Sequence, residues 1–228
     1  MRRFLRVFLG MSLAATAWAG ESANKAQGRV IAAGTILQEI QAAPDHGIPE
    51  EILASAACVA VVPSLLNGGF VLGLRYGRGV ATCRTPKGWS APAFFVVEGG
   101  SFGLQFGGQA VDMIMLVMNE DGMTKLLFSK FKLGAQVSAS AGPVGRQSSG
   151  ETDWKLHAQV LSYSRSRGVF AGATLEHGTI KPDKDSTRAF YGRMVPFKTS
   201  LRGVIDAPST TYPFLNPLAT WARVAADK

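Results

Sequence analysis

The amino-acid sequence predicts an α+β fold, in which N-terminal helices precede a curved, mostly antiparallel sheet rich in Gly and Ala. Apolar residues first repeat every three to four positions, between Arg29 and Ala43, and from about Phe70 onward they alternate with period two. The alternating segments are short and are separated by Gly- or Pro-bearing turns. Because small residues let backbones approach closely, the sheet is expected to bend into a barrel-like or sandwich arrangement.

Two helices are expected before the sheet. The first, from Arg29 to Ala43, carries an apolar stripe formed by Val30, Ala33, Leu37 and Ile40. The second starts near Pro49, because proline is tolerated in the first helical turn and Glu50 and Glu51 suit the positive end of a helix dipole.

The uncharged stretch from Ile52 to Leu74 is long enough for a transmembrane helix. Its interior argues against one, because Pro63 would break a helix and the run Val59–Val62 favours a strand. The sequence Asn67-Gly68-Gly69 is a turn signal. A strand, a hairpin turn and a second strand are therefore predicted in place of a membrane span.

The remaining elements follow from alternation and from caps. Strands are expected at Phe70–Leu74, Gly79–Arg84, Ala93–Glu98, Phe102–Phe106, Met113–Met118, Leu133–Ala141, Trp154–Arg165 and Val169–Glu176. Short helices are expected from Asp121 and at Ser186–Tyr191, and a final helix with Asn216 as its cap and Pro217 as its first residue.

The first nineteen residues have the pattern of a secretory signal peptide. Arg2, Arg3 and Arg6 give a positive start, Val7–Ala15 a short apolar core, and Ala17-Trp18-Ala19 a small-residue cleavage site. The expected product is one domain, residues 20–228, in the periplasm or secreted. Since no cysteine follows the apolar core until Cys58, no lipid anchor is expected.

Charge and cysteine content limit the partners and the compartment. Removing the signal peptide lowers the formal charge from +8 to +5, without a run of Lys or Arg, so nucleic acid is an unlikely partner class. The two cysteines, Cys58 and Cys83, would form a disulfide worth about 3 kcal/mol in an oxidising compartment. Their alternative is a pair of buried free thiols, because both lie in apolar strands.

Catalytic and metal motifs are weak. Gly99-Gly100-Ser101-Phe102-Gly103 matches the nucleophile elbow of α/β-hydrolases, which would make Ser101 a nucleophile, but the residues after it alternate like a strand. Asp112 or Asp153 with His157 or His177 would have to complete the triad. No histidine spacing indicates a metal site, and no dinucleotide or phosphate-loop motif indicates a cofactor. An envelope serine hydrolase stays as the alternative from another class.

Basic residues are the better candidates for a binding surface. With neighbouring aromatic and serine side chains, they would hold phosphate head groups by charge-assisted hydrogen bonds. The candidates are Lys25, Arg29, Lys130, Lys132, Arg146, Arg165 and Arg167.

Several ordered motifs resemble the SYLF lipid-binding domain, also called the yeast-type actin-binding domain. They are Trp89–Phe94, Gly99–Gly107, Asp112, Lys132–Gly134 with Ala141–Arg146, and Leu161–Gly172. The resemblance runs from about Val30 to Gly192 and identifies the chain as an exported bacterial member. It implies a non-catalytic module that binds anionic phospholipid.

Eukaryotic members are thought to bind lipid through a lysine-bearing N-terminal amphipathic segment, where this chain offers only Lys25 and Arg29. The sequence therefore predicts docking on an anionic membrane surface through the N-terminal helix and nearby cations. A structural domain that binds a protein partner is the third possibility.

Overall fold

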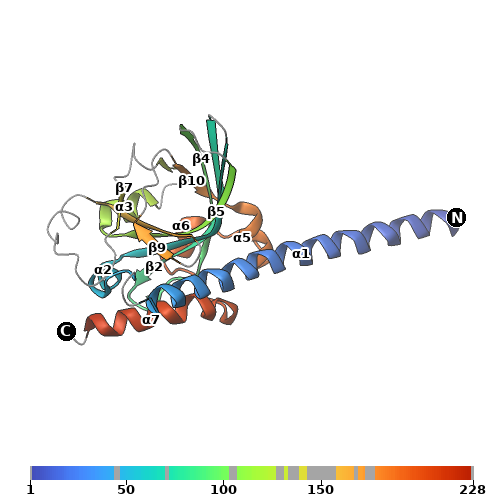
Figure 1. Ribbon diagram of the computed structural model, residues 1–228. Coiled ribbons are helices and arrows are strands. Elements are labelled where there is room, and N and C mark those ends of the chain that lie inside the picture. The colour runs from blue at the N-terminus through green and yellow to red at the C-terminus, as the bar shows by residue number, and fades with distance from the viewer. Residues whose placement is uncertain are drawn as a thin grey trace.

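The computed structural model describes residues 2–43, 47–69, 72–102, 107–126, 131–132, 139–142, 158–166, 169–172 and 178–226. Its helices are α1 (Arg2–Gln41), α2 (Glu50–Ser55), α3 (Glu120–Leu126), α5 (Lys184–Tyr191), α6 (Phe197–Leu201) and α7 (Tyr212–Ala226), with a short 3₁₀ helix, η1, at Ser209–Thr211. The N-terminal half of α1 extends away from the sheet (Figure 1). Within the described part of the chain, no helix is long and apolar enough to cross a membrane.

The strands form one sheet. They are β1 (Cys58–Gly69), β2 (Leu72–Thr85), β3 (Gly88–Trp89), β4 (Ala93–Phe102), β5 (Gly107–Val117), β6 (Phe131–Lys132), β7 (Ala139–Ala141), β8 (Val160–Ser166), β9 (Val169–Gly172) and β10 (Gly178–Pro182). The order is β6-β10-β4-β2-β1-β5-β8-β7, with β3 beside β2 and β9 beside β8. Among the described pairings, only β7 with β8 is parallel.

This architecture confirms the predicted α+β class and the mostly antiparallel sheet. The predicted barrel-like or sandwich arrangement is not seen among the described strands. Their order is open, from β6 at one end to β7 at the other, and they belong to one sheet. Helices, instead of a second sheet, supply the layers on its two faces.

Alternating side chains build a separate core on each face of the sheet. On β1, Val59 and Val61 pack with α1 and α7, while Ala60 and Val62 pack with residues of α3 and α6 on the other face. The face that meets α1 is called the α1 side below. Because both faces are covered here, these strands are apolar at every position, as expected for a central strand.

The contact between α1 and α7 depends on Gly34. A Cβ atom at Gly34 would lie 2.0 Å from the carbonyl oxygen of Pro213. Pro217 lies inside α7, four residues after Pro213, and has no backbone N–H. It therefore cannot donate the usual helical hydrogen bond to the Pro213 carbonyl. The prediction that α7 begins at Pro217 is therefore wrong. The helix starts at Tyr212, and the proline leaves a carbonyl that faces the bare backbone of α1.

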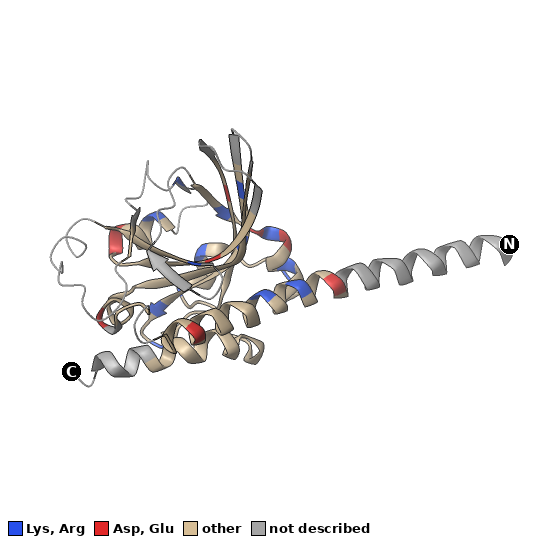
Figure 2. Ribbon diagram, in the orientation of Figure 1, with Lys and Arg blue, Asp and Glu red and all other residues tan. Residues whose placement is uncertain are grey.

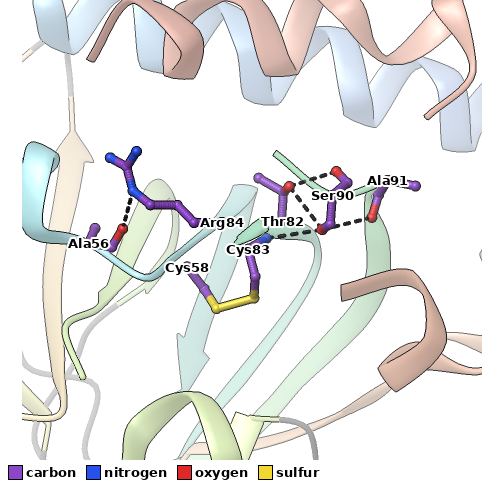
Figure 3. The surroundings of a disulfide bond; sticks show 7 residues. All are labelled: Ala56, Cys58, Thr82, Cys83, Arg84, Ser90 and Ala91. Atoms are coloured by element: carbon purple, nitrogen blue, oxygen red, sulfur yellow. Dashed lines mark hydrogen bonds between the residues drawn. A yellow bond between two sulfur atoms is a disulfide. The ribbon is translucent and has the colours of Figure 1, made fainter. Parts of the chain in front are cut away.

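A disulfide joins the first residue of β1 to a residue near the end of β2. Cys58 and Cys83 are a cross-strand pair, their sulfur atoms are bonded, and both side chains are buried (Figure 3). Next to them, the Arg84 Nε donates to the Ala56 carbonyl at 2.9 Å (Figure 3). The guanidinium of Arg84 therefore satisfies carbonyl groups at the end of α2 and holds this helix against the hairpin.

Strand β1 passes through Pro63 because of a bulge. The pairing register with β5 shifts between Val62 and Leu65, and Ser64 has a positive φ of 54°. The backbone N–H of Ser64 donates to Oδ1 of Asp112 at 2.9 Å. A bulge is a position where a strand tolerates proline, so β1 bends there without ending.

The central strands β1, β2, β4 and β5 are longer than the sequence patterns predicted. Asn67 to Gly69, expected as a hairpin turn, are paired with both β2 and β5. The two strands expected at Phe70–Leu74 and Gly79–Arg84 are one strand, β2. Glycine weakens a strand locally, but pairing on both sides compensates for it in the middle of the sheet.

Candidate functional site

The far ends of four central strands form a projecting part of the sheet, called the arm here. It comprises residues 65–69 of β1, 72–77 of β2, 98–102 of β4 and 107–111 of β5. These strand ends extend beyond the helices that cover the rest of the sheet (Figure 1). The arm begins immediately after the β1 bulge.

The α1 side of the arm exposes apolar side chains. Leu66 is 55% exposed and is in register with Tyr76 of β2, which is also exposed. Leu74, two residues before Tyr76 on the same face, is 75% exposed. Its cross-strand partners are Gly68 and Gly100, so the two residues directly opposite it have no side chain to cover it. Glycine on both sides thus produces a flat apolar surface.

An ion network lies at the base of the arm, where it meets α1 and α5. The Nη1 atoms of Arg29 and Arg78 lie 3.6 and 3.5 Å from Oδ2 of the buried Asp183. Ser186 links them, because Arg29 Nη1 donates to its Oγ at 3.0 Å and this hydroxyl donates to Asp183 Oδ2 at 2.7 Å. Asp183 also caps α5 by accepting from the Ser186 N–H.

The two arginines differ in their surroundings. The pKa of Arg29 is lowered, because the effect of burial is larger than the opposing effect of the Asp183 charge. The Nε of Arg78 donates to the Tyr76 hydroxyl at 3.0 Å, and this bond raises the pKa of Arg78. Both guanidinium groups stay protonated at neutral pH, since arginine titrates far above it. Arg78 presents a partly exposed charge beside the apolar arm, whereas Arg29 faces inward.

A second ion network holds the other end of α1 to the sheet. The Nε of Arg165 donates to Asp112 Oδ2 at 2.9 Å, and the guanidinium of Arg165 also pairs with Glu39 of α1. Asp112 in turn accepts from the Ser64 backbone, as described above. Arg165 therefore connects α1, β5 and β8 and supports the bulge at the base of the arm.

The prediction that the apolar stripe of α1 docks on the membrane is wrong, because the stripe is buried. Val30, Ala33, Leu37 and Ile40 are buried in the core between α1, the sheet and α7, so they are not available for insertion into lipid. Lys25 lies on the exposed face of α1 and pairs with Glu21 at 2.6 Å. Arg29, as shown above, is held by Ser186 and Asp183.

Cations occur on several strands near the base of the arm (Figure 2), and the strand register places three of them on the α1 side. Lys181 on β10 is in register with Val96, which is in register with Arg78. Lys132, on β6, is in register with Thr179 of β10. Thr179 lies two residues before Lys181 on the same strand, so Lys132 and Lys181 are on the same face of the sheet. We call Arg78, Lys132 and Lys181 the basic belt. Lys181 pairs with Glu98 at 2.6 Å.

Other predicted residues lie outside the described part of the chain or inside a strand. Lys130, Arg146 and Arg167 lie outside the described residues, as do Asp153, His157 and His177. Ser101 lies inside β4, in register with Gly73, whereas a nucleophile elbow needs its serine at a turn from strand to helix. Among the described residues, no group of three or more His, Cys, Asp or Glu side chains is placed to hold a metal ion.

Sequence reasoning missed Leu66, Leu74, Tyr76, Arg78 and Lys181. The alternation of Leu74, Tyr76 and Arg78 is present in the sequence, but Leu74 was expected to end one strand, and Tyr76 and Arg78 to lie in the turn before the next. A reading of β2 as one long strand would have placed these three side chains on one face.

Comparison with known proteins identifies similar chains. Residues 98–220 match the family described as Ysc84, Las17-binding protein actin regulator. LAS seventeen-binding protein 3 of Saccharomyces cerevisiae is 32% identical over 182 residues, which are 78% of this chain and 39% of that protein. SH3 domain-containing YSC84-like protein 1 of Homo sapiens is 33% identical over 152 residues, 65% of this chain and 44% of that protein.

The chain spans less than half the length of these curated relatives. Neither is named as an enzyme. The yeast protein is named for a binding partner, so the shared segment is similar to part of an interaction protein.

Proposed function

The chain belongs to the SYLF (Ysc84) family, and on that basis we propose that it is a non-catalytic module that docks on anionic phospholipid surfaces. The observation that carries the proposal is the basic belt. Three cations from three strands share one face of the sheet. Lys181 pairs with Glu98, and Arg78 lies near the buried Asp183, whose carboxylate it shares with Arg29. Lys and Arg near a membrane surface are each worth about 1 kcal/mol of attraction to anionic lipid.

The test is sedimentation of the purified protein with vesicles of graded anionic content at low and moderate salt. Binding is expected to rise with anionic lipid and to fall with salt, because surface charges are screened. Equal, negligible binding to neutral and anionic vesicles would contradict the proposal.

The belt itself is tested by a double variant, Lys132→Gln with Lys181→Gln. The matched control is Lys87→Gln with Lys198→Gln, which removes the same charge from exposed lysines elsewhere. Loss of the belt lysines is expected to weaken vesicle binding by about fivefold per residue, and the control by less. Equal losses in the two double variants would assign the attraction to net charge and not to the belt.

We also propose that the protein is exported and that residues 1–19 are removed. The signal-peptide pattern supports this, and so do the extension of α1 away from the sheet (Figure 1) and the Cys58–Cys83 disulfide. The first residue of the described core, Ala26, follows the expected cleavage site. Mass spectrometry of the protein from the periplasm or medium should give a chain that starts at Gly20.

A protein partner is the second candidate function, favoured by the name of the yeast relative, LAS seventeen-binding protein 3. It predicts that vesicles of every composition leave the protein in the supernatant, while a partner from the same compartment binds it.

A further inference from the structure

The most exposed described leucine of this protein lies on the arm, on the same face as the basic belt. Leu74 protrudes between two glycines, Gly68 and Gly100, and Leu66 protrudes beside the exposed Tyr76 of β2. The residue in register with Leu66 on β5 is Ala110. Exposed apolar surface of this kind marks a contact with an apolar partner, because it gains nothing from water.

We infer that the α1 side of the arm is the surface that enters the membrane interface, with Leu66 and Leu74 inserted into the acyl region. This inference rests on the proposed function and assigns its site to the arm, in place of α1.

The order of side chains along β2 supports lipid as the occupant. Leu74, Tyr76 and Arg78 share one face, and alternate residues of a strand are about 6.8 Å apart, so Leu74 and Arg78 are separated by about 14 Å. With the Leu74 end of the arm deepest in the bilayer, Leu74 lies among the acyl chains and Arg78 lies at the level of the phosphates. Tyr76 and its register partner Leu66 lie between them, at the boundary of the acyl chains and the interface. This is the order in which these side chains prefer to lie in a membrane.

The charges at the base of the arm fit an anionic surface better than a second copy of the chain. A two-fold contact through this face would bring the same patch of both copies together, including Arg78, Lys132 and Lys181. An anionic bilayer instead supplies phosphate to Arg78, which already shares its carboxylate partner Asp183 with Arg29.

The first test compares two double variants that remove similar exposed apolar area. Leu66→Ser with Leu74→Ser changes the arm. Ile31→Ser with Val204→Ser is the matched control, because these side chains are 46% and 70% exposed and lie on α1 and after α6. The arm variant is expected to bind anionic vesicles about a hundredfold more weakly than wild type, or about tenfold per leucine, and the control is expected to keep wild-type binding.

The second test reports insertion directly. An environment-sensitive fluorophore such as NBD is attached to Leu74→Cys and, as a control, to Val204→Cys, since Cys58 and Cys83 are bonded to each other. Anionic vesicles should shift the emission of the label at position 74 to the blue and leave position 204 unchanged. Circular dichroism and urea unfolding confirm that each variant is folded.

Three results would overturn the inference. The first is that wild type binds vesicles but the arm variant binds them equally well, or the label at position 74 shows no blue shift. Lipid docking would then stand, but its site would lie elsewhere on the protein. A wild-type dimer that the arm variant converts to monomer would assign the face to a second copy. Wild type that binds no vesicles would overturn the proposed function and this inference together.

Discussion

The two ends of β1 and β2 belong to the same antiparallel ladder but have opposite surroundings. Near the disulfide, Val61 is in register with Val80 and both are buried beneath α1. Beyond the bulge, Gly68 is in register with Leu74, which is exposed. The two strands are paired at both ends, so backbone pairing does not decide which end becomes core. Side-chain volume does, because a helix packs where neighbouring residues fill its grooves.

The largest expected difference between the two ends is in stability. Phe94→Ala, at the covered end, should lower the free energy of unfolding by about 3–5 kcal/mol, because a fully buried ring is lost. The ring centroid of Phe94 lies 5.0 Å from that of Phe190. Leu74→Ala, on the arm, should change it by no more than about 0.5 kcal/mol. Urea unfolding followed by circular dichroism measures both values.

A loss of more than about 2 kcal/mol in Leu74→Ala would show that the arm surface packs against something in the free protein. The comparison between a covered and an uncovered end would then fail.

The disulfide gives the next largest effect. It closes a loop that contains β1 and the part of β2 up to Cys83, with a sequence separation of 25 residues. Cys58→Ala with Cys83→Ala should lower the free energy of unfolding by about 3 kcal/mol, because the unfolded chain regains the freedom of that loop. Wild type should lose a similar amount in reductant, and the double variant, as control, should not respond. An equal response of both proteins to reductant would show that the effect does not come from this bond.

Two glycines of α1 give the smallest effect and separate packing from backbone entropy. Gly34→Ala should cost about 1–3 kcal/mol, since its Cβ would meet the backbone of Pro213 and Phe214. Gly28→Ala has no atom within 4 Å of the added Cβ and should stabilise the protein by about 0.5–1 kcal/mol. Thermal unfolding of both variants is the measurement. If both substitutions were stabilising, the close contact of α1 with α7 would be relaxed in solution.

The sequence predicted the classes of elements well and their ends less well. The apolar stripe of α1 predicted a helix with one buried face, and this face is buried. The same stripe was assigned to lipid, because amphipathic periodicity describes a helix that packs on a sheet as well as one that lies on a membrane.

The candidate site was predicted only in part. Of the described cations that the sequence singled out, Lys132 belongs to the basic belt, whereas Arg29 and Arg165 form ion pairs that hold α1 to the sheet. Arg78 and Lys181 were missed, because their place beside the arm depends on strand register. Register results from pairing between distant segments, and local patterns do not encode it.

By itself, the sequence determined the α+β class, the family, the signal-peptide pattern and the positions of the two cysteines. Each of these depends on neighbouring residues or on motifs of fixed spacing. Only the tertiary structure decided that the apolar face of α1 is buried in the core and that Leu66 and Leu74 remain exposed. The physical reason is competition for burial. Which of several apolar surfaces is covered depends on how strands and helices from distant parts of the chain fill the space between them.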